Sequence, residues 1–242
     1  METIIYPLIP SIWGEEIKYS LRSIDKFLNL DFRVIVYGSY KPNWLNTNVV
    51  EFVLSPIFES SVVPKVQFNQ GIIYKKIIAR EDIDNFIFFN DDIYLIQPIS
   101  SLDKVYFRDT KLFTEPVNKT NNSWRRLLQN TRRRLQNEGN TSYNFETHIP
   151  YKIDAKKLSS LLPVLEGTEL LATSYYNTFG PKENLCRCNA VKTGCYDTHA
   201  VHSCIEELKL DTHIWFNHND NGLAVAKNVL PKMFPKKSKF EC

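Results

Sequence analysis

The stretch FIFFNDDIYL, residues 86–95, indicates the fold of this chain more directly than any other ten residues. An apolar run that ends in Asn90, Asp91 and Asp92 is typical of a short strand buried on both faces. Two adjacent carboxylates in a low-dielectric setting repel each other unless a cation lies beside them. The stretch therefore predicts a buried strand with a metal site at its end. A strand followed by an Asx-rich turn is the alternative, which the residues alone leave open.

The segments around this stretch alternate between strand and helix patterns. The expected strands are 4–8, 32–37, 49–54 and 85–94, and the expected helices are 15–27, 68–79, 123–136, 155–162, one around 175–176, and 223–230. Such alternation with short connections predicts an α/β fold with a mostly parallel central sheet flanked by helices. Ligands bind beyond the carboxyl ends of the strands in these sheets, which is where Asp91 and Asp92 fall.

Composition narrows the class of protein. The chain has 242 residues, of which 43% are hydrophobic, and a net charge of +3, so no nucleic-acid partner is expected. Only 8 residues are Gly, and neither GxGxxG nor GxxxxGK[ST] occurs, which counts against dinucleotide-binding and P-loop chemistry. We find no secretory signal and no apolar run long enough to span a membrane, and we expect a cytoplasmic protein with reduced thiols. Peripheral contact with a membrane stays open.

The segment 123–136 is the most basic part of the chain, with Arg125, Arg126, Arg132, Arg133 and Arg134. A solvated helix face is one interpretation. A platform for phosphate or an anionic acceptor is the other, because Arg binds phosphate oxygens in a bidentate manner. In that case Arg125 and Arg126 would contact substrate. The same helix would serve a non-catalytic module that binds an anionic polymer.

A second unusual segment is rich in potential zinc ligands. These are Cys186, Cys188, Cys195, His199, His202 and Cys204. A structural Zn²⁺ is possible, but Cys-x-Cys is tighter than the usual Cys-x₂₋₄-Cys spacing, so a loop of free thiols is favoured.

Four blocks of the chain resemble the Stealth family, the sugar-phosphate transferases of capsule synthesis and lysosomal-enzyme tagging. Where the family has E-L-R-Y-S-L-R-S-I-E, P-x-W-L-N and F-I-Y-x-N-D-D, this chain has EIKYSLRSID at 16–25, PNWLN at 42–46 and FIFFNDD at 86–92. The family's H-x-P-x-x-I-D stands as HIPYKID at 148–154. Its N-D-N and F-P-x-x-S-x-F-E stand as NDN at 219–221 and FPKKSKFE at 234–241. One block departs from the family, because the usual aspartate and Y-T-W are replaced by IIYPL at 4–8.

The resemblance implies a nucleotide-sugar transferase (GT-A-like) core that transfers a sugar-1-phosphate from a nucleotide sugar to a hydroxyl of a glycan or polysaccharide. Transfer of the sugar itself by a glycosyltransferase of similar fold is the alternative. A Mg²⁺ or Mn²⁺ ion would be held by Asp91, Asp92, Asp220 and Asn221. His148 would be the general base, and Arg22, Asn90 and Asn219 would contact substrate. Arg22 could instead form a surface charge or an ion pair at the edge of the core.

The resemblance also implies a single transferase domain over residues 1–242. Two segments have no counterpart in the family blocks and are expected to be insertions, namely a basic helical segment at about 99–140 and the Cys/His-rich segment at about 181–213.

Overall fold

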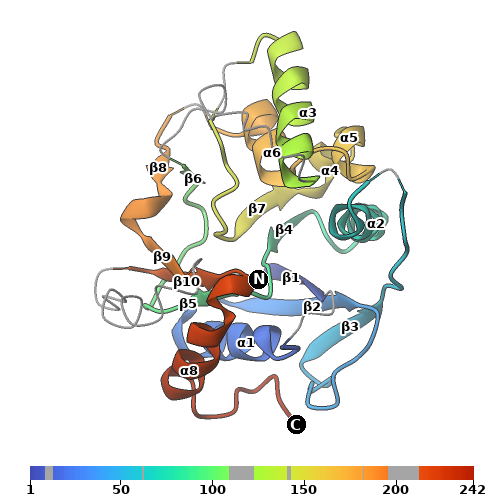
Figure 1. Ribbon diagram of the computed structural model, residues 1–242. Helices are drawn as coiled ribbons and strands as arrows, with labels where there is room; N and C mark the ends of the chain where they lie inside the picture. Colours follow the sequence, from blue (N-terminus) through green and yellow to red (C-terminus); the bar gives the residue numbers. More distant parts are fainter. Residues whose placement is uncertain (9–12, 62, 109–122, 141–142, 182, 196–212) are drawn as a thin grey trace.

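The computed structural model describes residues 1–8, 13–61, 63–108, 123–140, 143–181, 183–195 and 213–242 (Figure 1). Within these residues the main sheet has the strand order β3-β2-β1-β4-β7. β1, β2, β3 and β4 are parallel, and β7 lies antiparallel to β4 at one edge. The strands are β1 (Glu2–Leu8), β2 (Phe32–Gly38), β3 (Val50–Leu54), β4 (Asn85–Phe88) and β7 (Tyr151–Asp154). The predicted mostly parallel central sheet is confirmed, whereas β7 was not predicted.

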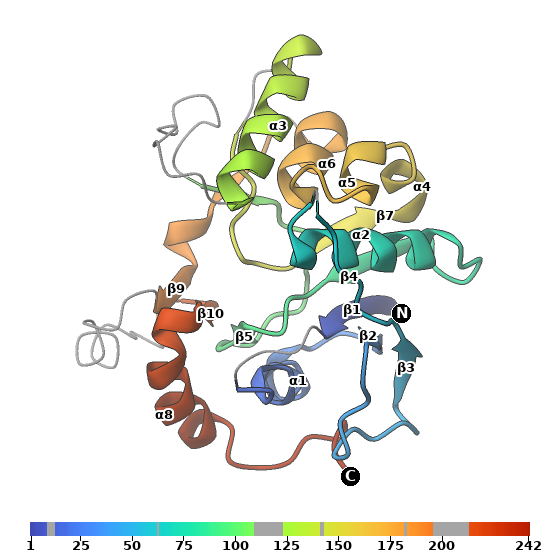
Figure 2. The ribbon, with the colours of Figure 1, turned by 45° about the vertical axis from the view of Figure 1, so that its right-hand side comes forward.

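Helices cover both faces of this sheet (Figure 2). α1 (Glu16–Phe27) places Ile17, Leu21 and Ile24 against side chains such as Ile4 and Val34. α2 (Lys65–Ile78) covers the opposite face, where its apolar side chains meet Ile5, Ile35 and Phe86. Neighbouring residues of a strand point to opposite faces, so the continuous apolar runs of β1 and β2 are buried on both sides. Flanking helices are therefore confirmed.

The predicted strand 85–94 is correct for 85–88 and wrong beyond it, because the chain leaves the main sheet after Phe88. β5 (Ile93–Leu95) belongs to a second sheet with the order β5-β10-β9. In this sheet β10 (Trp215–His218) pairs antiparallel with β5 and parallel with β9 (Lys192–Cys195). α8 (Leu223–Met233) packs on it through Val225, Ala226 and Leu230. The three residues Asn90, Asp91 and Asp92 therefore connect two different sheets.

The predicted helix 155–162 is also wrong, since two short helices stand there. α4 (Ala155–Leu158) is capped by Asp154, whose side chain accepts a hydrogen bond of 2.9 Å from the backbone N–H of Lys157. The chain then turns into α5 (Leu162–Leu165), where Pro163 stands in the first turn and has no N–H to continue a preceding helix. The remaining described elements are β6 (Tyr106–Phe107), α3 (Ser123–Asn137), α6 (Leu171–Phe179), β8 (Cys186–Arg187), η2 (Cys188–Ala190) and η4 (Asp220–Gly222).

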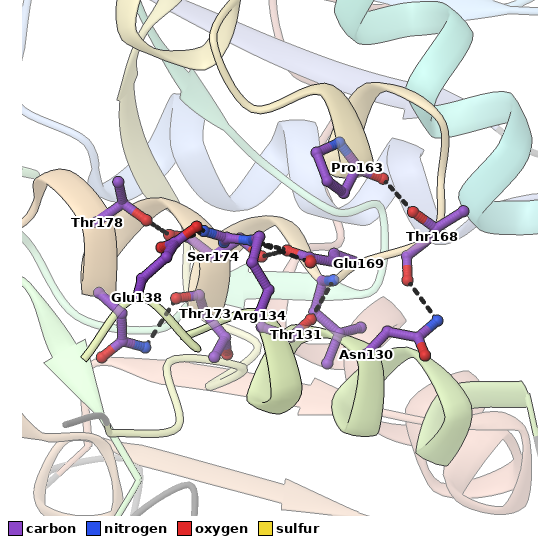
Figure 3. Close-up of polar contacts among 12 residues, drawn as sticks. Asn130, Thr131, Arg134, Glu138, Pro163, Thr168, Glu169, Thr173, Ser174 and Thr178 are labelled. Atoms are coloured by element: carbon purple, nitrogen blue, oxygen red, sulfur yellow. Dashed lines mark hydrogen bonds and ion pairs between the residues drawn. The ribbon is translucent and has the colours of Figure 1, made fainter. Parts of the chain in front are cut away.

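The basic helix α3 is fixed to the molecule by its less polar face. Leu127, Leu128 and Leu135 are buried in a small cluster with Leu170. The hydroxyl of Thr131 accepts a hydrogen bond of 3.0 Å from the backbone N–H of Leu170 (Figure 3). The predicted helix at 123–136 is thus present, and it packs against the start of α6.

An ion-pair network strengthens the same contact. Arg134 donates to both carboxylate oxygens of Glu169, at 3.0 and 2.8 Å, and to those of Glu138, at 2.9 and 2.8 Å (Figure 3). Ser174 donates a further hydrogen bond of 2.7 Å to Glu169. Arg134 is therefore a structural residue that links α3 to α6, whereas Arg126 and Arg133 are exposed.

In the part of the chain that the structure describes, none of the helices combines the length and apolar character that crossing a membrane requires.

Candidate active site

A cleft of about 320 Å³ opens beyond the carboxyl ends of β1, β4 and β10. Its floor includes Pro7 of β1, Phe88 of β4 and His218 of β10, and Glu16 reaches it from the start of α1. α2 forms one wall, and Trp124 at the start of α3 contributes to the rim. The position agrees with the general rule for ligand sites in parallel α/β sheets.

Three predicted residues enter the cleft from the connection between the two sheets, namely Asn90, Asp91 and Asp92. Burial raises the pKa of Asp91, and the charges of Asp92 and Glu16 raise it further. Burial also raises the pKa of Asp92, and Glu16 and Asp220 act in the same direction. One carboxylate oxygen of Asp92, Oδ1, is buried without a hydrogen-bond partner among the described residues. The protein alone thus leaves this concentration of negative charge poorly compensated.

These residues fit a divalent cation. Carboxylate oxygens are the ligands that Mg²⁺ and Mn²⁺ prefer, and Mg²⁺ is usually held by one or two carboxylates together with substrate phosphates. The unpartnered Oδ1 of Asp92 supplies a free ligand atom, and Asp91, Glu16 and Asp220 stand nearby in the same cleft. Among the described residues no three His, Cys, Asp or Glu side chains already converge as a preformed metal centre. Residues Asp91 and Asp92 would therefore hold the cation together with ligand atoms from a bound substrate.

His148 reaches the cleft from a strained backbone. Its φ angle is +48°, in the left-handed region that costs a residue with a side chain about 1 kcal/mol or more. The preceding carbonyl, that of Thr147, accepts a hydrogen bond of 2.7 Å from Nζ of Lys192 on β9. Strain of this kind is common at functional sites, where the surrounding structure holds a residue in place.

His148 is neutral at pH 7. Its side chain is exposed to the cleft, yet the surrounding protein atoms and the cations Lys192 and Arg108 lower its pKa. A pKa lowered to about 4 keeps the imidazole neutral at pH 7, so that it can accept a proton, and it also makes His148 a weaker base than a free imidazole. Burial also lowers the pKa of Lys192 itself, to about 8.

The end of β10 contributes His218, Asn219 and Asp220 to the cleft. His218 Nδ1 lies 3.1 Å from the carbonyl oxygen of Asn219, which can only accept, so this nitrogen carries the proton. Nε2 then accepts a hydrogen bond of 2.9 Å from the hydroxyl of Tyr94. Both ring nitrogens are therefore engaged within the protein. Asp220 is exposed and faces the cleft.

The structure brings together six of the residues selected from the sequence, and it separates four others from them. Those in the cleft are Asn90, Asp91, Asp92, His148, Asn219 and Asp220. Asn219 also caps η4, since its side chain accepts from the N–H of Gly222 at 3.1 Å. Asn221 is exposed, and neither it nor Arg125 nor Arg126 lines the cleft.

Arg22 lies elsewhere. It donates two hydrogen bonds of 2.7 Å to the carboxylate of Glu241 and one of 2.8 Å to the carbonyl of Phe234. The expectation that Arg22 contacts substrate has no support in this geometry. The alternative, an ion pair at the edge of the core, describes its position.

Glu16 and His218 line the cleft, and Lys192 supports it through the carbonyl of Thr147, yet none of the three was selected from the sequence. Glu16 opens the block EIKYSLRSID, so its place in that block was a usable signal. His218 directly precedes the NDN block at 219–221. No motif in the sequence pointed to Lys192, because Lys192 is brought to the site only by the pairing of β9 with β10, in which it lies opposite the distant Trp215.

The structure describes only part of the proposed zinc segment. Cys186 and Cys188 are outside any disulfide, and Cys188 is buried. His199, His202 and Cys204 lie outside the described residues, as does the side chain of Cys195. A zinc site here stays a prediction.

Comparison with solved structures finds proteins named as glycosyltransferases. The glycosyltransferase GlyE of Streptococcus pneumoniae TIGR4 matches with a TM-score of 0.43 and 9% identity over 89% of this chain, which spans 54% of the GlyE chain. The galactosyltransferase LgtC, in complex with donor and acceptor sugar analogues, matches with a TM-score of 0.45 and 10% identity, covering 97% of this chain and 96% of LgtC. An active-site mutant of LgtC gives 0.48 and 10%, with coverage of 96% and 94%.

Similarity at this level assigns no residue a role, and the fold class rests on the sheet described above. No protein-family model and no curated protein matches the sequence.

Proposed function

We propose that this protein is a metal-dependent transferase that moves a group from a nucleotide sugar to a hydroxyl of a glycan or polysaccharide acceptor. The observation that carries the proposal is the cleft in which Asp91, Asp92, Asp220 and His148 meet. These residues come from three of the blocks that resemble the Stealth family, and they lie far apart in the sequence. A common cleft is what a shared site would require of them.

The donor would bind on the acidic side of the cleft. A bound Mg²⁺ or Mn²⁺ ion would neutralise the diphosphate of the donor and help the nucleotide to leave. Asp91 and Asp92 would hold this ion, and Asp220 would face it from the end of β10. Without the ion, three or more carboxylates in this cleft would repel a diphosphate. Donor binding should therefore depend on the divalent cation.

The acceptor would meet His148. A neutral imidazole accepts the proton of a hydroxyl as that hydroxyl attacks, and the lowered pKa of His148 keeps it neutral. Lys192 fixes the carbonyl before His148 and thereby holds the backbone that carries the base. This assignment needs only residues of the described cleft and its immediate support.

Transfer of a sugar-1-phosphate is the first candidate reaction, on the strength of the Stealth-like blocks. Transfer of the sugar alone is the second, because a cation on the diphosphate and a base for the hydroxyl serve either reaction equally well. The two differ in their products. Sugar-phosphate transfer releases a nucleoside monophosphate, and glycosyl transfer releases a nucleoside diphosphate.

A binding module based on the basic helix has less support. One of its five arginines, Arg134, is committed to Glu169 and Glu138, and the helix uses its apolar face to pack on α6. The exposed Arg126 and Arg133 can still contact an anionic acceptor.

The experiment is a nucleotide-release assay with UDP- and GDP-sugars, whose diphosphate makes the two products distinguishable, in the presence of Mg²⁺, Mn²⁺ or chelator, with and without glycan acceptors. Metal-dependent release of a nucleoside monophosphate supports transfer of a sugar-1-phosphate. Metal-dependent release of a nucleoside diphosphate supports transfer of the sugar alone. Asp91→Asn and Asp92→Asn should abolish release, and His148→Ala should lower its rate by about 10²–10⁴. Asp84→Asn, an exposed aspartate just before β4, is the matched control and should behave as wild type. Metal-independent release, or full activity of both aspartate variants, would overturn the proposal.

A further inference from the structure

A cluster of lysines lies on one face of the molecule and takes no part in the cleft. Its members come from the end of α1, the end of α8 and the C-terminal segment, and all are exposed: Lys26, Lys232, Lys236, Lys237 and Lys239, called here the lysine face. Figures 1 and 2 both show the C-terminal segment passing beneath α1 from the end of α8. Two contacts join these parts. Lys26 lies over the ring of Phe234, and Lys239 forms an ion pair with Asp25.

The charge of this face is one-sided. Among the described residues, the five lysines face the carboxylate of Asp25, and the nearby Arg22 and Glu241 neutralise each other. Glu241 is buried and paired with Arg22, so it presents almost no charge to solvent. The lysine face therefore carries a larger positive charge than the net +3 of the whole chain.

The shape of the face includes a hollow of about 360 Å³ between α1 and the segment 233–238. Lys26, Lys236 and Lys237 stand around it, with Met233 and Pro235 between them. Lys232 and Lys239 extend the charge on either side of the hollow. The arrangement is thus a broad charged surface with a few apolar groups, and not a closed site for a single anion.

The use of Lys instead of Arg also favours a broad charged surface over a site for a single anion. Arg gives bidentate and directional recognition of phosphate, whereas Lys acts as a mobile point charge on a flexible stem. Clusters of four to eight basic residues on a helix or adjoining segment are typical of binding to anionic lipid surfaces. A soluble anionic polymer is the competing occupant of such a charged surface, and the experiment below distinguishes it.

We propose that the lysine face docks the protein on an anionic membrane surface. The inference does not depend on the reaction in the cleft. It does place that cleft, because α8 begins at Leu223, directly after the turn that holds Asp220, and its last turn carries Lys232. With 11 residues at about 1.5 Å each, α8 separates the two regions by about 16 Å. A membrane on the lysine face leaves the cleft open and within reach of molecules carried on that membrane.

Binding is expected to follow the rules of surface electrostatics. Each lysine near an anionic surface contributes about five-fold in affinity. The triple variant Lys232→Gln, Lys236→Gln, Lys237→Gln should therefore bind about 100-fold more weakly. These side chains are exposed, so the variant should keep the thermal stability of wild type.

A matched control removes the same number of charges elsewhere. Lys75 on α2 and Lys156 and Lys157 on α4 are exposed and belong to the opposite side of the sheet from α1. The variant Lys75→Gln, Lys156→Gln, Lys157→Gln has the same net charge as the test variant. Any difference between the two must come from where the charges lie.

The experiment is co-sedimentation of the full chain with vesicles of phosphatidylcholine alone or mixed with phosphatidylglycerol. We expect binding to the mixed vesicles only, with loss in the test variant and retention in the control variant. Binding of wild type to the mixed vesicles should also weaken as the salt concentration rises from about 0.1 to 1 M, because the Debye length falls from about 10 to 3 Å.

Equal loss in both variants, or no binding to mixed vesicles, would overturn the proposal. So would competition by glycerol phosphate at millimolar concentration, which would indicate a site for a free anion, or equally tight binding to a soluble anionic polymer. None of these outcomes bears on nucleotide release, so the docking surface and the transferase can fail separately.

Discussion

The ion pair between Arg22 and Glu241 gives the sharpest stability prediction. Their side chains are only 10% and 1% exposed, and Arg22 joins α1 to the last residues of the described chain. Arg22→Met keeps most of the side-chain volume but leaves the Glu241 carboxylate buried with only the hydrogen bonds from Ser238, at 2.8 and 3.0 Å. Removing one partner of a buried pair costs about 3–5 kcal/mol. For a chain of this size that corresponds to a fall in Tm of about 10 °C.

The pH dependence of this variant follows from the same contacts. Burial alone would raise the pKa of Glu241, but the hydrogen bonds from Arg22 and Ser238 lower it overall. A carboxyl with a lowered pKa stabilises the folded state above its unfolded pKa, and this contribution is lost as the pH falls through the folded pKa. The difference between wild type and Arg22→Met should therefore be largest near pH 7 and should shrink below about pH 4.

Urea unfolding followed by circular dichroism at pH 7 and at acid pH measures both effects. Lys65→Met is the control, because Lys65 pairs with Glu59 in an exposed position, where an ion pair contributes about 0–1 kcal/mol. The double variant Arg22→Met, Glu241→Gln should regain much of the lost stability. A loss in Arg22→Met no larger than that in the control would refute the reasoning.

Three further predictions concern the cleft and its support. Burial raises the pKa of Asp92, so the contribution of Asp92 to the free energy of unfolding favours folding at low pH and is lost as the pH rises through the folded pKa. Mn²⁺ at about 100 Kd should add about 2.7 kcal/mol to the free energy of unfolding of wild type but not of Asp92→Asn. Equal thermal shifts in both proteins would contradict this prediction. Gly71→Ala would place a Cβ 2.5 Å from the carbonyl oxygen of Leu165, so it should cost about 1–3 kcal/mol in thermal unfolding, and an unchanged Tm would show that α5 can move away. Lys192→Met should raise the pKa of His148 in an NMR titration of its imidazole, since Lys192 is one cause of the lowered value, and an unchanged titration would exclude that influence.

The sequence was sufficient for the parallel strands of the main sheet, because β1, β2 and β4 are largely apolar runs, but it was not sufficient for the antiparallel β7. It was misleading at residues 85–94, where the same apolar character continues through β5. β5 is buried by pairing with β10, more than a hundred residues away, and no local pattern shows that the chain has changed sheets. The helix predicted at 155–162 failed for a local reason, since Pro163 and the capping Asp154 favour two short helices.

The candidate site was predictable to the extent that its residues lie in recognisable blocks. Asp91, Asp92, His148 and Asp220 were selected in that way, and the structure places them in one cleft. Arg22 belongs to such a block as well, but helical spacing cannot distinguish a charge that meets a substrate from one that meets Glu241. The support given by Lys192 depends on a strand pairing and could not be read from its neighbours in the chain.

The connection between β4 and β5 gives the acidic residues an unusual dependence on distant packing. Asn90, Asp91 and Asp92 belong to neither sheet, so their position is set by how the two sheets meet. One contact that sets it is the edge-to-face packing of Phe89 on Trp215, with ring centroids 5.9 Å apart. A library of random variants screened for activity should therefore yield inactive members at such apolar positions, with the acidic residues intact. Directed repacking of the same contact would in turn adjust the cleft in small steps without any substitution inside it.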